Sequence, residues 1–130
     1  MGLASGRKDF FNALKPERMN MPNEFYDKDF LFPSFDQVIN QRIYESENLS
    51  TQNETFEYLT AYKYPKEVAT QESVGDYIEL MDKYDYIYAG VTESGGIVYQ
   101  NGKRVIFIIL SVSFPDNSIA ELAIGTGIYR

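Results

Sequence analysis

The side chains that can do chemistry in this chain are carboxylates, amines and hydroxyls, because its 130 residues include no histidine and no cysteine. Their absence excludes thiolate nucleophiles, Ser-His and Cys-His pairs, and zinc sites of the usual Cys/His kind. Ser5 and Lys8 have the spacing Ser-x-x-Lys. On a helix this spacing puts the hydroxyl and the amine on one face, where the lysine can act as a base. Because the spacing is common by chance, we favour the alternative, a polar N-terminal segment.

Four carboxylates recur at every third position, Asp76, Glu79, Asp82 and Asp85. Hard cations such as Ca²⁺ are bound by several carboxylates, so these residues are the candidate metal ligands. The chain has no DxDxDG-like loop, however, and an acidic solvated helix face is the simpler interpretation. Acid-base work on a sugar, for example by Glu72 with Asp76, needs a defined separation across a cleft that a sequence does not specify. We predict no cofactor.

Composition sets the class of protein. Apolar residues make up 44% and charged residues 24%, which is typical of a globular chain, and we expect one domain over residues 1–130. A fragment of a larger protein would look the same. The net charge of −7 disfavours nucleic-acid binding. No apolar run approaches the ~18 residues of a membrane span, and no secretion signal is visible at the N-terminus.

The clearest structural pattern is a hairpin. The stretch YAGVTESGGIVYQNGKRVIFIILSVSF, residues 88–114, predicts two strands joined by a tight turn at Asn101-Gly102. The run Val105–Leu110 has no polar break, which is typical of a strand that is buried on both faces. A further short strand is predicted at EVATQES, residues 67–73.

Helices are predicted around these strands. Apolar spacing and capping pairs favour helices at residues 8–14, at Ser34–Tyr44, from Thr51 to before Pro65, from Asp76 to Tyr84, and at the C-terminus from Ser118. A long structured loop is expected at residues 15–33, where three prolines occur. The predicted fold class is α+β, with an antiparallel sheet of at least three strands flanked by helices.

Several of these segments together resemble a known family. YPKEVATQES, the hairpin stretch and SIAELAIGTGIYR resemble the C-terminal third of class A β-lactamases and related penicillin-binding serine hydrolases. KPERMNMPNEFYDKDFLFPSFDQVINQRIY is similar to the Ω-loop of that family and the helix after it. The resemblance implies an α/β sandwich-like fold and a place at the bacterial cell envelope.

The departures from the family imply a degenerate active site. The Lys-Thr-Gly strand of the family is matched here by Gln71-Glu72-Ser73, which brings a carboxylate to the place where an anionic substrate would dock. Lys15 falls where class A enzymes have the deacylating Glu, and the catalytic Ser-x-x-Lys helix and Ser-Asp-Asn loop have no counterpart in this chain. The resemblance therefore implies a non-catalytic binding or structural module, whose old pocket would be lined by Gln71, Glu72, Ser73, Lys15 and Glu17.

Partners follow from the apolar strand and from the acidic residues. Three bare side chains on one face of Val105–Leu110 would forgo roughly 5–9 kcal/mol, so that strand must be covered. We expect its free edge to pair with a second copy or with a missing N-terminal segment. The alternative function is a free-standing acidic α+β interaction module of phage, mobile-element or immunity type. In that case the stripe Asp76–Asp85 binds a basic protein.

Overall fold

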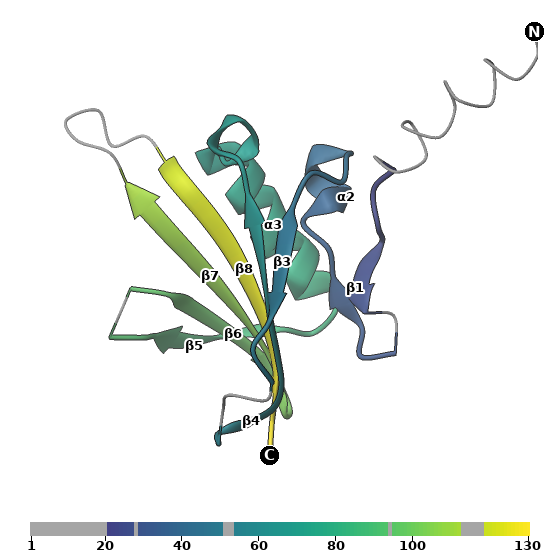
Figure 1. The fold of residues 1–130 in the computed structure, drawn as a ribbon, viewed down its shortest axis with the longest axis vertical. Coiled ribbons are helices and arrows are strands. Elements are labelled where there is room, and N and C mark those ends of the chain that lie inside the picture. Colours follow the sequence, from purple (N-terminus) through teal and green to yellow (C-terminus); the bar gives the residue numbers. More distant parts are fainter. Residues whose placement is uncertain (1–20, 28, 51–53, 94, 113–118) are drawn as a thin grey trace, which may run out of the picture.

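The computed structural model describes residues 21–27, 29–50, 54–93, 95–112 and 119–130. Its main feature is a six-stranded antiparallel sheet with the strand order β3-β4-β8-β7-β6-β5 (Figure 1). The strands are β3 (Glu45–Asn48), β4 (Phe56–Tyr64), β5 (Ile87–Val91), β6 (Ile97–Asn101), β7 (Arg104–Val112) and β8 (Ile119–Tyr129). A small second sheet pairs β1 (Phe25–Asp27) with β2 (Phe32–Pro33). The fold is thus mixed α+β, as predicted, with more strand than expected.

Two α-helices accompany the sheet, α2 (Asp36–Ile39) and α3 (Gln71–Lys83). Helix α3 connects β4 to β5, which is the far edge strand, and the chain then returns strand by strand until β8 lies beside β4. The Phe35 ring, at the start of α2, contacts both Tyr77 of α3 and Tyr64 of β4. Both described helices, from the set that was predicted to flank the sheet, therefore pack on the same face of it.

The hydrophobic core lies between α3 and this inner face. Tyr77 and Met81 of α3 are fully buried, and they belong to one cluster with Ile106, Ile108 and Ile124 of the two central strands. Burying each of these large side chains is worth about 1.5–3 kcal/mol. Helix α3 is thereby fixed across the sheet, and its exposed residues are held in a defined orientation towards β5 and β6.

Strand β7 is covered, but in a way that the sequence did not indicate. Ile106 and Ile108 face the helical core. On the other face of the sheet, Val105 is buried. The Val105 side chain and the Phe56 ring both lie close above Gly127, within 3.2 Å of the position that a Cβ on this glycine would take. Aromatic side chains of the sheet itself therefore shield part of the outer face. The backbone of β7 pairs with β6 on one side and with β8 on the other. The prediction of a free edge at Val105–Leu110 was wrong, because β8 occupies that edge.

Two segments predicted as helices are strands. In β4 the side chains of Tyr58, Thr60, Tyr62 and Tyr64 alternate with outer-face residues, so the aromatic period is two and not three or four. In β8 the C-terminal segment uses Gly125 beneath the Phe107 ring, where a Cβ would lie only 3.3 Å from the ring. Glycine disfavours a helix but permits this close approach.

One segment predicted as a strand is helical. Residues 67–73 form a short 3-10 helix, η2 (Lys66–Val68), and the first turn of α3. Thr70 caps α3: its hydroxyl accepts a hydrogen bond from the Ser73 amide at 3.0 Å, and the Ser73 hydroxyl accepts one from the Thr70 amide at 2.9 Å. This reciprocal cap uses serine in place of the usual Glu or Gln, which explains why the pattern was missed. The predicted helix over 76–84 is real and begins earlier.

Other boundaries also differ from the predictions. The helix predicted at Ser34–Tyr44 stops at Asn40, which takes φ = 56°, a left-handed conformation that asparagine tolerates. A tight turn joins β6 to β7, but one residue later than predicted: Asn101 ends β6 and pairs with Arg104, so Gly102, at φ = 61°, and Lys103 form the two-residue turn. The first arm of that hairpin divides into β5 and β6. The helix expected at residues 8–14 and the caps at Thr51 and Ser118 lie outside the described residues.

Candidate functional site

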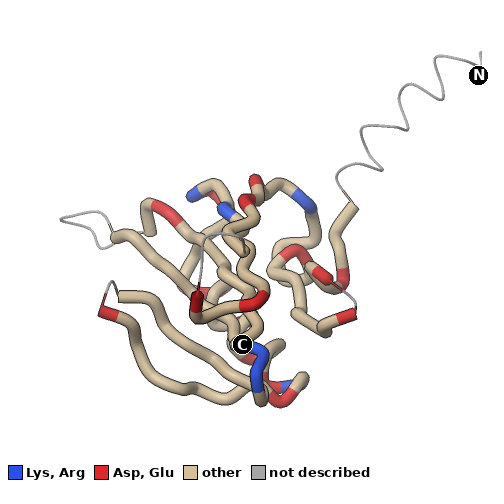
Figure 2. The backbone as a smooth tube through the Cα atoms, turned by 60° about the horizontal axis from the view of Figure 1, so that its bottom comes forward, with Lys and Arg blue, Asp and Glu red and all other residues tan. Residues whose placement is uncertain are grey.

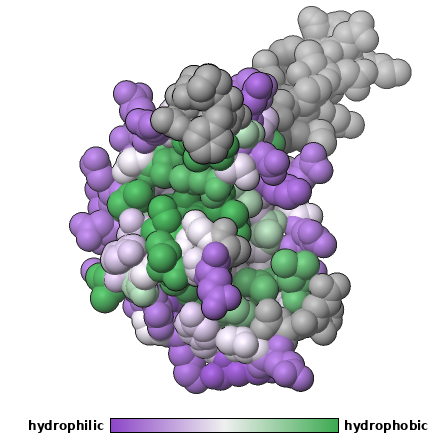
Figure 3. Space-filling view, turned by 90° about the vertical axis from the view of Figure 1, so that its left-hand side faces the viewer, coloured by the Kyte–Doolittle hydropathy of each residue, from purple (hydrophilic) through white to green (hydrophobic). Residues whose placement is uncertain are grey.

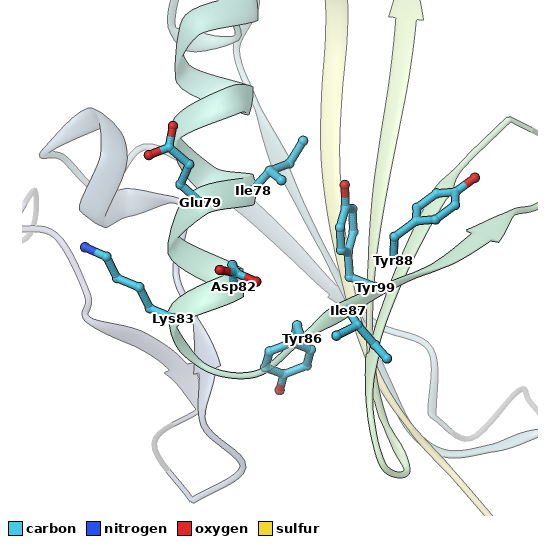
Figure 4. Close-up of a pocket in the computed structure, with 8 residues that line it drawn as sticks. All are labelled: Ile78, Glu79, Asp82, Lys83, Tyr86, Ile87, Tyr88 and Tyr99. Carbon is cyan, nitrogen blue, oxygen red and sulfur yellow. The ribbon is translucent and has the colours of Figure 1, made fainter.

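An open pocket lies between the C-terminal half of α3 and the edge strands β5 and β6 (Figure 4). Its volume is about 550 Å³, and more of its lining is apolar than polar. The lining residues are Ile78, Glu79, Asp82, Lys83, Tyr86, Ile87, Tyr88 and Tyr99. Largely apolar concave sites with a few polar groups are the usual form of binding sites, so this pocket is the candidate functional site.

Three tyrosines form the strand side of the pocket. The rings of Tyr88 and Tyr99 meet edge to face, with centroids 6.0 Å apart. Burial raises the pKa of Tyr99, and the neighbouring Tyr88 raises it further. Burial raises the pKa of Tyr86 to about 12, although the nearby Arg104 lowers it, and the Tyr86 hydroxyl donates to the Leu31 carbonyl at 3.2 Å. Tyr88 and Tyr99 are the tyrosines of this wall that a ligand can reach, because Tyr86 is only 2% exposed and its hydroxyl is already hydrogen-bonded.

The helix side of the pocket carries charge. Ile78 and Asp82 are one helical turn apart, and both project from the side of α3 that is turned towards the strands (Figure 4). Glu79 and Lys83 project from the other side of the helix, where they also line a second hollow, between α2 and α3. Asp82 is thus a carboxylate that lines the same pocket as the Tyr88 and Tyr99 rings. The other charged residues of the lining are Glu79 and Lys83, and over the whole chain Asp and Glu outnumber Lys and Arg by 19 to 12 (Figure 2).

The four acidic residues of the predicted stripe are exposed, as expected, but they do not lie together in one site. Asp76, Glu79, Asp82 and Asp85 are all exposed. Asp76 lines the hollow between α2 and α3, Asp82 lines the tyrosine pocket, and Asp85 follows the helix with φ = 65°. Within the described part of the chain, no three Asp or Glu side chains are gathered closely enough to hold a metal ion.

The binding residues implied by the family resemblance are placed differently. Gln71, Glu72 and Ser73 lie in the first turn of α3 and not in a strand beside the hairpin. Gln71 and Glu72 are exposed, while the Ser73 hydroxyl is used by the cap and also donates to the Val68 carbonyl at 2.8 Å. Residues 71–73 are helical, and a helical segment cannot pair as a strand of a sheet. The pocket strand that the resemblance implied is therefore absent at these residues. The remaining candidates, Ser5, Lys8, Lys15 and Glu17, lie outside the described residues.

A buried polar network was not anticipated. Asp36 is fully buried; its Oδ1 accepts from the Tyr64 hydroxyl at 2.8 Å and its Oδ2 accepts from the Asn23 amide at 3.1 Å. The Tyr26 and Tyr64 hydroxyls are 2.5 Å apart. Because Tyr64 gives its proton to Asp36, Tyr26 must be the donor in this pair. Tyr26 in turn accepts from the Phe35 amide at 3.2 Å, so the donors run in one direction and end at the carboxylate.

The network joins the β1–β2 unit and α2 to the central sheet. Burial raises the pKa of Asp36, although its hydrogen bonds from Asn23, Tyr64 and Ser34 lower it. Burial also raises the pKa of Tyr64 and of Tyr26, so both phenols stay protonated. Since both Asp36 oxygens are already hydrogen-bonded within the protein, we infer that this network stabilises the fold and does not bind a ligand. The sequence does carry one signal for this network: in PSFDQVI an aspartate lies between apolar residues, and a carboxylate that becomes buried there needs hydrogen-bond donors.

Comparison of the chain with protein-family models, with curated proteins and with solved structures finds no match. Among the described residues, no helix has the length and apolar character needed to cross a membrane. The functional argument therefore depends on the pocket itself.

Proposed function

We propose that this protein is an acidic interaction module that binds a basic segment of a partner protein, with an Arg or Lys side chain in the pocket between α3 and β5–β6. The observation that carries the proposal is the pairing of Asp82 with the aromatic wall of Tyr88 and Tyr99 around one open pocket. The stem of an Arg or Lys side chain packs on apolar surface while its head stays in water. Its cation is attracted by tyrosine ring faces and by a carboxylate.

The overall charge supports the same class of partner. A net charge of −7 attracts basic surfaces and speeds their encounter with the protein. Lys83 also lines the pocket, and its positive charge opposes this attraction in part. Glu79 lies on the same side of α3 as Lys83, and its negative charge offsets that of the lysine. A guanidinium fits better than an ammonium, because it is planar and stacks on aromatic rings.

The test uses N-acetyl-arginine amide as the probe, titrated into ¹⁵N-labelled protein and followed by amide chemical shifts. We expect the shifts to centre on Ile78, Asp82, Tyr88 and Tyr99. N-acetyl-citrulline amide, which has nearly the same shape without the charge, should bind more weakly. Asp82→Asn should weaken arginine binding by about 1.5- to 5-fold, the range for an exposed ion pair.

Glu45→Gln is the matched control, because it removes the same charge from the exposed strand β3 at the opposite end of the sheet. If Glu45→Gln weakens binding as much as Asp82→Asn, the attraction is a property of net charge and the pocket is not the site. Equal binding of the arginine and citrulline probes would also contradict the proposal.

A second proposal is the non-catalytic module resembling a β-lactamase or a penicillin-binding protein, working at the cell envelope. The β6–β7 hairpin, in the order that the resemblance requires, supports it. The segments at 71–73 and 119–129 give it no support, because they form a helix and a strand where the resemblance implies the reverse. Covalent labelling of Ser5 by a fluorescent penicillin, together with failure of the arginine probe, would favour an active hydrolase-like protein over both proposals.

A further inference from the structure

Strand β5 is an end strand of the main sheet, and it lacks the charges and prolines that protect such an edge. Natural edge strands carry charges, prolines or bulges that prevent pairing with another chain. The opposite edge, β3, has the sequence ESEN, with two carboxylates, and all four of its residues are exposed. Strand β5 has the sequence IYAGV, without a charge or a proline, and Ile87, Tyr88 and Val91 are 61–68% exposed.

The apolar character of β5 continues over neighbouring surface. Ile109 and Val112 of β7 are also large exposed hydrophobic residues, at 42% and 47%. Figure 3 looks at the side of the molecule where β5, β6 and β7 lie, and it shows apolar side chains gathered in the middle of this face. The edge of β5 thus borders a surface that water solvates poorly.

The backbone of β5 offers hydrogen-bonding groups at its outer edge. The Thr92 amide, just after β5, donates to the Gly96 carbonyl at 2.8 Å. Inward and outward groups alternate along an antiparallel strand, so the N–H and C=O of the preceding residue, Val91, point away from β6. A bulge between Tyr88 and Gly90, with Gly90 at φ = 125°, breaks the register at the other end of β5. The pairing edge therefore centres on the Gly90–Val91 end.

The pocket lies at the other end of the same strand, because Ile87 and Tyr88 of β5 line it. We infer that β5 accepts an extended basic segment of the partner protein as an added strand, which places one Arg or Lys side chain in the pocket beside Asp82. This inference rests on the proposed function and names its mode of binding. In strand addition, backbone hydrogen bonds supply affinity while alternate side chains enter pockets and supply specificity.

Charge identifies the occupant as a basic segment and not a second copy of this chain. β5 is preceded by Asp85 and followed by Glu93. An antiparallel pair of two copies would bring Asp85 and Glu93 of both copies to one shared edge, and each copy carries a net charge of −7. Repulsion between surfaces of the same charge disfavours their association. An extended segment that carries an Arg or Lys side chain instead meets these carboxylates favourably.

The probe for this inference is an acetylated, amidated six-residue peptide of valine and threonine around one arginine. We expect it to bind at least tenfold more tightly than N-acetyl-arginine amide, with added amide protection at Val91. Two N-methylated versions, each blocking the donors on one edge of the peptide, separate backbone pairing from side-chain binding. One of the two should bind at least tenfold more weakly than the parent peptide, while the other is less affected.

The protein variants are Val91→Pro, which removes the outward N–H, and Val91→Thr, which keeps it. Val91→Pro should weaken peptide binding and leave binding of N-acetyl-arginine amide unchanged; if this variant does not fold, the N-methylated peptides still test the inference. Equal binding of all three peptides, with Asp82→Asn still harmful, would overturn strand addition and leave the proposed pocket intact. Failure of N-acetyl-arginine amide to bind would overturn the proposed function. A dimer that Val91→Pro dissociates would show that a second copy occupies the edge.

Discussion

At the scale of single residues, the most unusual group is Asp36. A buried carboxylate is costly unless its oxygens are hydrogen-bonded, and here Tyr64 and the Asn23 amide supply the bonds. Burial nevertheless raises the pKa of Asp36, so desolvation outweighs those bonds. The carboxyl therefore binds its proton more tightly in the folded protein than in the unfolded chain.

The raised pKa predicts a direction for the pH dependence of stability. The contribution of Asp36 is fully present below its ordinary pKa, about 4, and is lost as pH rises through the higher folded value. The unfolding free energy of wild type minus that of Asp36→Asn should therefore fall as pH rises above about 4 and then level off. Urea unfolding between pH 3 and pH 8 measures this difference.

Asp85→Asn is the control for this prediction, because it removes an exposed carboxylate at a left-handed position that asparagine also tolerates. A difference curve for Asp85→Asn with the same shape as that for Asp36→Asn would show that net charge, and not burial at Asp36, causes the pH dependence.

At the scale of elements, glycine has opposite roles in α3 and β8. Gly75 lies inside α3, and a Cβ there would meet nothing within 4 Å. Gly127 lies in β8 with the Phe56 ring 3.1 Å and Val105 3.2 Å from where its Cβ would be. The first glycine costs helix stability, whereas the second is required by the packing of the outer face.

The same substitution should therefore act in opposite directions at the two positions. Gly75→Ala should stabilise the protein by about 0.5–1 kcal/mol, because alanine loses less backbone entropy in a helix. Gly127→Ala should destabilise it by about 1–3 kcal/mol through overpacking against Phe56 and Val105. Thermal and urea unfolding measure both effects, and each variant is the control for the other. Stabilisation by Gly127→Ala would contradict the packing described for β8.

At the scale of the whole molecule, stability is concentrated in the middle of the sheet. β7 and β8 are paired along nearly their full lengths, and Ile106, Ile108 and Ile124 are completely buried beneath α3. The edge strands β3 and β5 are mostly exposed, and within the described part of the chain each pairs on one side only. A ligand that binds at β5 can therefore order this edge strand without disturbing the core.

Native-state hydrogen exchange should reproduce this arrangement. Amides of β7 and β8 should exchange slowest, near the free energy of global unfolding, and amides of β3 and β5 should exchange by local opening at least tenfold faster. The amide exchange rates of residues 106 and 108 in β7 can be compared directly with those of residue 46 in β3 and residue 88 in β5. Rapid exchange throughout Val105–Leu110 would contradict the interior position of β7.

The sequence by itself determined local features. Asn101-Gly102 specified a hairpin turn, the apolar run after it specified a buried strand, and the acidic residues of 76–85 specified an exposed helix face. Each depends on neighbours along the chain. The tertiary structure alone decided that 56–64 and 119–129 are strands, because these segments pair with each other between residues far apart along the chain, such as Thr60 and Thr126. It also decided that β3 and β5 are the end strands of the main sheet and that Tyr88 and Tyr99 line one pocket with Asp82.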